Sequence, residues 1–135
     1  MQATSGLLQN VSNPVRNCVA CGLEMIETLR EISPCWDVRI GVHIGPVVAG
    51  VVGNKYSLFD VWGDTVNTAS RVETHGLPGG ITVSKDALDC IKGECEYDFL
   101  GECEAKGLGM IGLYSVLELR DLKNKRPHVE LHNST

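Results

Sequence analysis

Phe59-Asp60-Val61-Trp62-Gly63-Asp64-Thr65-Val66-Asn67-Thr68-Ala69-Ser70-Arg71 is the stretch that decides the fold class of this chain. Its first residues suit a pleated, half-buried surface, because Phe59, Val61 and Trp62 are aromatic or β-branched. Gly63 then breaks the run, and Asp64 is a residue type favoured at a helix N-cap. The stretch therefore predicts a strand, a tight turn and a helix in immediate succession.

The expected helix places an amide and a guanidinium side by side. Asn67 and Arg71 are four residues apart, so they are neighbours on one helical face. The apolar side of the same helix comprises Val66, Ala69 and Val72. An isolated pair of this kind is typical of a solvated helix face, so its interpretation depends on the neighbouring strand.

That strand carries a carboxylate on an apolar face. Asp60 alternates onto the same side as Leu58 and Trp62, where its charge is costly unless a donor binds it. A strand-borne acceptor, a turn and a helix with two polar side chains can therefore line one pocket.

Two segments together resemble the catalytic domain of the class III nucleotidyl cyclases. They are Phe59 to Arg71 and Arg39 to Gly53, the second of which reads R-I-G-V-H-I-G-P-V-V-A-G-V-V-G. Lys106 and Gly107 in A-K-G-L-G complete the matching landmarks, and the match extends from the first residue to about residue 119. The resemblance implies an α+β, ferredoxin-like fold that lacks the N-terminal strands of the family.

The resemblance also implies a reaction and roles for named residues. In this family the ribose 3′-hydroxyl of a nucleoside triphosphate attacks its own α-phosphorus, which gives a cyclic monophosphate and pyrophosphate. Arg71 matches the residue that stabilises charge on the α-phosphate, a task that suits a planar, permanently charged fork. Asn67 matches the residue that positions the ribose, and Lys106 matches a cation that contacts the triphosphate. Without the resemblance, Lys106 is simply an exposed lysine beside glycines.

Asp60 matches the family position that reads the purine. A carboxylate accepts a hydrogen bond from the amino group of adenine but faces the carbonyl oxygen of guanine. The expected substrate is therefore ATP, and the expected product is 3′,5′-cyclic AMP. The alternatives are a guanylyl cyclase, or a nucleotide-binding or dimerisation module without catalytic activity.

The two metal-binding aspartates of the family have no counterpart among the aspartates of this chain, which are at positions 37, 60, 64, 86, 89, 98 and 121. The resemblance implies Mg²⁺ or Mn²⁺ in the complete domain, with ligands that this chain does not contain. The chain alone is therefore expected to be inactive. A second cyclase domain is the expected partner, because the family builds its site across a dimer interface.

Composition narrows the class of protein further. The chain has 135 residues, an apolar fraction of 43% and a formal net charge of -5. This acidic balance provides no basic field for nucleic acid. No apolar run is long enough to span a membrane, and we expect a cytoplasmic location, which leaves open a membrane tether elsewhere in a parent protein.

Cysteines and glycines predict no second site. Cys18 and Cys21 have C-x-x-C spacing, but no second pair completes a tetrahedral metal site, so the six cysteines are interpreted as free thiols. Gly45, Gly50 and Gly53 are followed neither by Lys-Ser/Thr nor by a helix, which excludes a P-loop. They are interpreted as part of a bent strand or β-arm, and in the resembled family this arm contacts the partner subunit.

Hydrophobic periodicity and turn residues predict the remaining elements. They are a helix at 15–32, extended segments at 37–44 and 47–52, a short strand at 80–84, a helix from 85 to about 91 and two strands near 97–104 and 110–119. Ser84 is expected to cap the helix at 85, and Gly76 to end the helix of Arg71 in the left-handed conformation. His43 is interpreted as structural or exposed. Residues 1–120 form the expected partial domain, and 121–135 a polar, mobile tail.

Overall fold

A mixed four-stranded sheet forms the centre of the molecule. The computed structural model describes residues 2–7, 11–52, 58–120 and 130–132. The strand order is β2-β5-β7-β6, in which β2 and β5 are parallel and the other neighbours are antiparallel. These strands are β2 (Ile40–Val42), β5 (Ile81–Ser84), β6 (Cys95–Ala105) and β7 (Gly109–Leu119). The expected combination of strands and helices in one α+β domain is confirmed.

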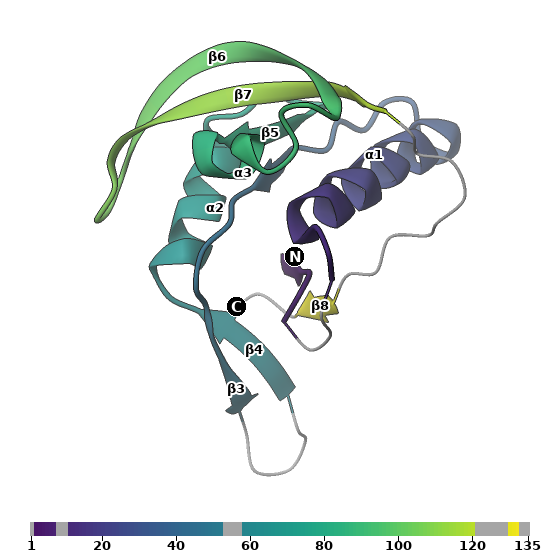
Figure 1. The fold of residues 1–135 in the computed structure, drawn as a ribbon. Helices are drawn as coiled ribbons and strands as arrows, with labels where there is room; N and C mark the ends of the chain where they lie inside the picture. Colours follow the sequence, from purple (N-terminus) through teal and green to yellow (C-terminus); the bar gives the residue numbers. More distant parts are fainter. Residues whose placement is uncertain (1, 8–10, 53–57, 121–129, 133–135) are drawn as a thin grey trace.

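The described residues form three helices beside this sheet: α1 (Pro14–Ile32), α2 (Asp64–Thr74) and α3 (Lys85–Asp89). Figure 1 shows the long β6–β7 hairpin as an arch over α3, with α1 and α2 on opposite sides below it. The main core joins α1 and α3 to the sheet, and its fully buried side chains include Val19, Ile81, Val83, Leu88 and Ile91. Among the described residues, no helix is both long and apolar enough to cross a bilayer.

The strand, turn and helix expected from the quoted stretch are present. Strand β4 (Leu58–Trp62) pairs with β3 (Val48–Val52) in an antiparallel hairpin that projects away from the sheet in Figure 1. Gly63 follows β4 with φ of 123°, a value that side chains rarely allow, and α2 begins at the next residue. The hairpin has the extended shape expected of a β-arm.

Helix α2 stops at His75 and Gly76, where its end is expected, but Asp64 is not the N-cap and Gly76 is not left-handed. Gly63 occupies the N-cap without a side-chain hydrogen bond, and Asp64 is the first helical residue, where the helix dipole favours a carboxylate. Gly76 does not have positive φ; the cap is His75 in another conformation. A Cβ on Gly76 would lie 2.4 Å from Oγ1 of Thr82, so glycine is needed there for close packing.

Other boundaries differ in extent. The segment expected as a strand at 37–44 is paired only over Ile40–Val42, because only these residues face β5. Within the tail expected to be mobile, residues Glu130–His132 form β8, which pairs with β1 (Gln2–Thr4). The remaining tail residues lie outside the described ranges, and the domain boundary near residue 120 stays a prediction. All six cysteines are free, as expected.

Candidate functional site

Helix α2 presents Asn67 and Arg71 to solvent. Both side chains are exposed, whereas the next residue after each, Thr68 and Val72, is buried on an adjacent side of the helix. The helix is held close to β2: a Cβ on Gly41 would lie only 2.3 Å from the backbone nitrogen of Glu73. Close packing on β2 thus fixes one side of α2, and the predicted polar pair lies on a side of the helix that is exposed to solvent.

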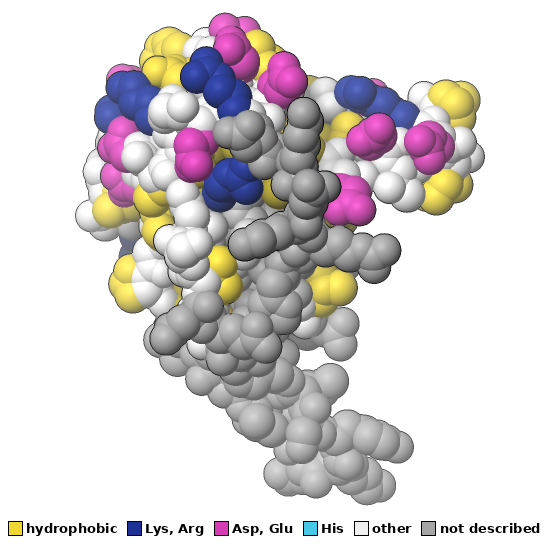
Figure 2. Space-filling view, turned by 45° about the vertical axis from the view of Figure 1, so that its right-hand side comes forward, with side chains coloured by type: hydrophobic (Ala, Val, Ile, Leu, Met, Phe, Trp, Pro, Cys, Tyr) yellow, Lys and Arg dark blue, Asp and Glu magenta, His cyan; other side chains and the backbone are white. Residues whose placement is uncertain are grey.

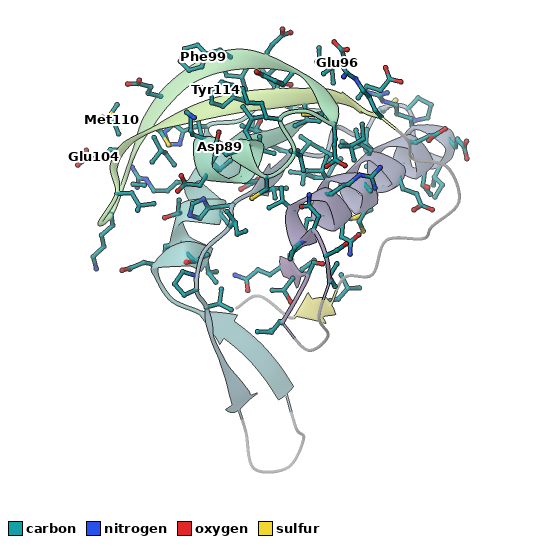
Figure 3. All side chains as sticks on the ribbon, viewed as in Figure 1. Asp89, Glu96, Phe99, Glu104, Met110 and Tyr114 are labelled. Carbon is teal, nitrogen blue, oxygen red and sulfur yellow. The ribbon has the colours of Figure 1, made fainter. Side chains whose placement is uncertain are left out.

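Arg71 is tied to the β6–β7 hairpin. Its Nε donates a hydrogen bond of 2.7 Å to the backbone carbonyl oxygen of Glu104, thirty-three residues away in sequence. The register of β6 and β7 pairs Glu104 with Met110, and Figure 3 shows both at the end of the hairpin nearer to its turn. The predicted α-phosphate cation therefore lies beside this end of the hairpin.

Lys106 occupies that turn. It follows Ala105, the last residue of β6, and its side chain is exposed. Gly107 and Gly109 have φ of 82° and 71°, and Leu108 N–H donates to the Ala105 carbonyl at 3.1 Å, so the turn depends on its glycines. Lys106 is two residues beyond the carbonyl that holds Arg71. The structure therefore brings the two predicted phosphate-binding cations to one end of the molecule.

Asp60 is placed only by its backbone. It lies in β4 opposite Gly50 of β3, three residues before Gly63. Its side chain lies outside what the structure describes, so the geometry between Asp60 and Asn67 is not part of the observed site. The purine-reading role of Asp60 stays a prediction.

The larger described cavity lies on another side of α2. It has a volume of about 490 Å³ and is bounded by β1, α1, β2 and α2. Thr65, Ala69 and Glu73 contribute to its wall, and Asn67, Arg71 and Lys106 do not. The predicted cations are thus exposed and lie outside this cavity.

Three observations describe the charged and titratable side chains of the described residues. On the face that Figure 2 shows, Lys and Arg side chains of the described residues are interspersed with Asp and Glu rather than gathered into one basic patch. Burial raises the pKa of the Cys103 thiol near Arg71, and the positive charge of Arg71 opposes this rise. Within the described ranges, no group of three His, Cys, Asp or Glu side chains is arranged to hold a metal ion.

The sequence did not reveal the hydrogen-bond partners of Arg71 and His43. The acceptor for Arg71 is a backbone carbonyl, which no side-chain pattern reveals. His43 was interpreted as structural or exposed; its Nδ1 lies 2.7 Å from Oγ of Ser84, which is a structural contact between β2 and the start of α3.

Comparison with known proteins identifies the family. The sequence model described as the adenylate and guanylate cyclase catalytic domain matches residues 1–118. The chain belongs to this family. The resemblance inferred from the quoted motifs is thereby confirmed, and the fold is that of a class III cyclase catalytic domain.

Curated relatives are mostly guanylyl cyclases by name. The chain is 45% identical over 82 residues to guanylate cyclase soluble subunit beta-2 of Rattus norvegicus, covering 60% of the chain and 12% of that protein. It is 45% identical over 97 residues to guanylyl cyclase C of Homo sapiens, covering 70% of the chain and 9% of that protein. The chain therefore spans a small part of each relative.

Solved cyclase domains share the fold over most of the chain. The guanylate cyclase domain of RhGC from Catenaria anguillulae, in complex with GTP, has a TM-score of 0.75 and 31% identity, with 86% of this chain and 66% of that chain covered. The adenylyl cyclase CyaB from P. aeruginosa has a TM-score of 0.71 and 21% identity, with coverage of 84% and 65%. The second likeness concerns the fold alone.

Proposed function

We propose that this chain is part of a nucleotidyl cyclase domain that converts a purine nucleoside triphosphate to a 3′,5′-cyclic monophosphate and pyrophosphate. The observation that carries the proposal is the placement of Arg71 and Lys106 at one end of the molecule, with Asn67 one helical turn from Arg71. The family match over residues 1–118 supplies the reaction class.

The reaction makes one P–O bond and breaks one O–H bond and one P–O bond. The ribose 3′-hydroxyl gives its proton to water as its oxygen bonds to the α-phosphorus, and the bond from that phosphorus to the bridging oxygen breaks, so pyrophosphate leaves. Charge spreads over the phosphate oxygens in the transition state, where a guanidinium stabilises it more than it stabilises the substrate. We assign this task to Arg71, the positioning of the ribose to Asn67 and the binding of the triphosphate to Lys106.

The family uses divalent metal ions, and the described residues do not fit one. Within the described ranges, no three or more His, Cys, Asp or Glu side chains are grouped to hold a metal ion, and no aspartate matches the two metal-binding positions of the family. We propose that Mg²⁺ or Mn²⁺ is held by groups outside this chain, in the complete domain, and we assign to this chain only the positioning and charge stabilisation above. Alone, the chain is then inactive.

Two observations point to different purines. The two curated relatives named above are guanylyl cyclases by name, and the structure from Catenaria anguillulae contains GTP, which favours GTP as the substrate. Asp60, by its chemistry, favours adenine. A related structure is described as the catalytic core of a rhodopsin-guanylyl cyclase with converted specificity in complex with ATPalphaS, at 33% identity and a TM-score of 0.72. GTP has the broader support, and ATP remains the second candidate because of Asp60 alone.

A second cyclase domain is the proposed partner. One solved relative, from Blastocladiella emersonii, is described as a non-canonical dimeric guanylyl cyclase domain, with 27% identity and a TM-score of 0.72. The open surface around Arg71 and Lys106 is consistent with a site that a second domain completes. We place this domain in the cytoplasm, where its nucleotide substrate is available.

The test is an assay of the complete cyclase domain with each nucleotide. We expect the unmodified domain to form a cyclic nucleotide. Arg71→Ala should lower kcat by about 100-fold or more, which is the usual effect of losing a donor that stabilises the transition state. Arg39→Ala is the matched control, because Arg39 is also exposed but bonds the carbonyl of Thr74 at the C-terminal end of α2 and not the β6–β7 hairpin. Full turnover after Arg71→Ala would leave the chain as a nucleotide-binding or dimerisation module without catalytic activity.

A further inference from the structure

The guanidinium of Arg71 is restrained at Nε, and its two Nη groups bind no partner within the described part of the chain. Nε donates to the Glu104 carbonyl at 2.7 Å, and an exposed arginine side chain would otherwise rotate among many rotamers. With Nε bound to the carbonyl, the side-on fork of Nε and one Nη is occupied, and the end-on fork of Nη1 and Nη2 remains for bidentate binding of a phosphate. The contact thus restrains the guanidinium and selects its end-on fork for an anionic ligand.

The acceptor is itself held by its neighbours in β6. The Glu104 side chain is exposed, but Cys103 and Ala105 on either side are 5% and 1% exposed. Cys103 packs with Val72 and Leu113 in a small core that is separate from the main one. Val72 directly follows Arg71 on α2. One thiol side chain therefore joins the strand that carries the acceptor to the helix that carries the donor.

We propose that Cys103 is a positioning residue for Arg71: its packing against Val72 fixes the Glu104 carbonyl beneath the guanidinium and so sets the direction of the fork. The proposal rests on the function proposed above. It also links Arg71 to Lys106, because Lys106 lies three residues after Cys103 and shares the same anchored end of β6. Cys103 acts by packing, since burial keeps its thiol protonated.

The chain offers a matched control at the other end of the same strand. Cys95 is also a free, buried cysteine of β6, 3% exposed, but it packs in the main core with α1 and α3. Cys95→Ala and Cys103→Ala therefore remove the same atom from two cores of one strand. Both variants should lower the stability of the fold, whereas only Cys103→Ala should release Arg71 from its hydrogen bond.

The first measurement uses the chain itself and needs no catalysis. In ¹H–¹⁵N spectra of the arginine side chains, we expect the Nε proton of Arg71 to exchange with solvent at least about tenfold more slowly than that of Arg39, which bonds through Nη1. Cys103→Ala should remove this protection, Cys95→Ala should keep it, and Cys103→Val, which refills the core, should restore it. Unprotected Nε in the unmodified chain, or equal loss in both alanine variants, would overturn the proposal.

The second measurement uses the complete cyclase domain. We expect Cys103→Ala to lower kcat by about tenfold with KM changed less than about twofold, because a misdirected guanidinium loses transition-state contacts. In an Arg71→Lys background, which lacks Nε, the same substitution should change kcat by less than about twofold. An undiminished effect in that background means that Cys103 is only structural. Retained activity after Arg71→Ala would instead contradict the proposed function, so the two failures are distinguishable.

Discussion

The imidazole of His43 lies 2.7 Å from the hydroxyl of Ser84, and this contact joins the end of β2 to the N-cap of α3. Ser84 is almost fully buried and also accepts a hydrogen bond from the backbone nitrogen of Ala87 at 3.3 Å. The hydroxyl proton is therefore available to Nδ1 of a neutral imidazole. Protonation of His43 removes this acceptor and places a charge in a half-buried site.

This geometry predicts a pH dependence of stability. Burial lowers the pKa of His43 from its usual value of 6.5, and the charge of Asp86 opposes this change only in part. The unfolded chain therefore binds the proton more readily than the folded chain. The stability that neutral His43 contributes is fully present above its unfolded pKa and is lost as the pH falls through its folded pKa. The free energy of unfolding, measured by urea titration, should fall between about pH 7.5 and about pH 5. This fall should be smaller for His43→Gln than for the unmodified chain. An equal difference would contradict this assignment.

Close packing of α2 on β2 predicts a large effect at one glycine. The Cβ of an alanine at position 41 would lie 2.3 Å from the backbone nitrogen of Glu73, and backbone atoms cannot move aside as a flexible side chain can. Gly41→Ala should lower the free energy of unfolding by about 2 kcal/mol or more, measured by urea titration. Gly93→Ala is the control, because nothing lies within 4 Å of its Cβ position, and it should stay within about 0.5 kcal/mol.

The sequence predicted the elements better than their ends. The strand, Gly63 turn and helix around Arg71 were predictable because the hydrophobic period changes from two to 3.6 at one glycine. The conformation of Gly76 was not, because glycine is required there by Thr82, a residue brought close only by the fold. Likewise, β8 forms because Glu130–His132 meet β1, more than a hundred residues away in sequence.

The residue types of the candidate site could be predicted from the sequence, but the contacts between its residues could not. Spacing alone placed Asn67 and Arg71 on one face, and both are exposed there. The approach of Arg71 to the Lys106 turn depends on a backbone carbonyl and on the small core beneath it, neither of which leaves a pattern in the sequence. The purine preference expected from Asp60 is less well supported than its guanylyl alternative, because relatives share the fold with several chemistries.

Lys106 tests the triphosphate end of the proposed site. Lys106→Gln removes an exposed charge from a turn whose shape depends on Gly107 and Gly109, so the fold should be unaffected. In the complete domain we expect KM for the nucleotide to rise by about tenfold, with a weaker dependence of KM on salt, because one charge-assisted contact is lost. Lys92→Gln is the control, since Lys92 is exposed in the turn between α3 and β6. Equal KM values for both variants would remove Lys106 from the site.

Asp60 tests how the purine is read. A carboxylate accepts a hydrogen bond from adenine and repels the carbonyl oxygen of guanine, whereas a small thiol does neither. In the complete domain, Asp60→Cys should raise the ratio of kcat/KM for GTP to that for ATP by about tenfold or more, whichever nucleotide the unmodified domain prefers. Asp64→Cys, the same change at the exposed first residue of α2, should leave this ratio within about twofold because only the helix end is affected. If the ratio does not change in Asp60→Cys, another residue reads the purine, and the remaining reason to consider ATP is lost.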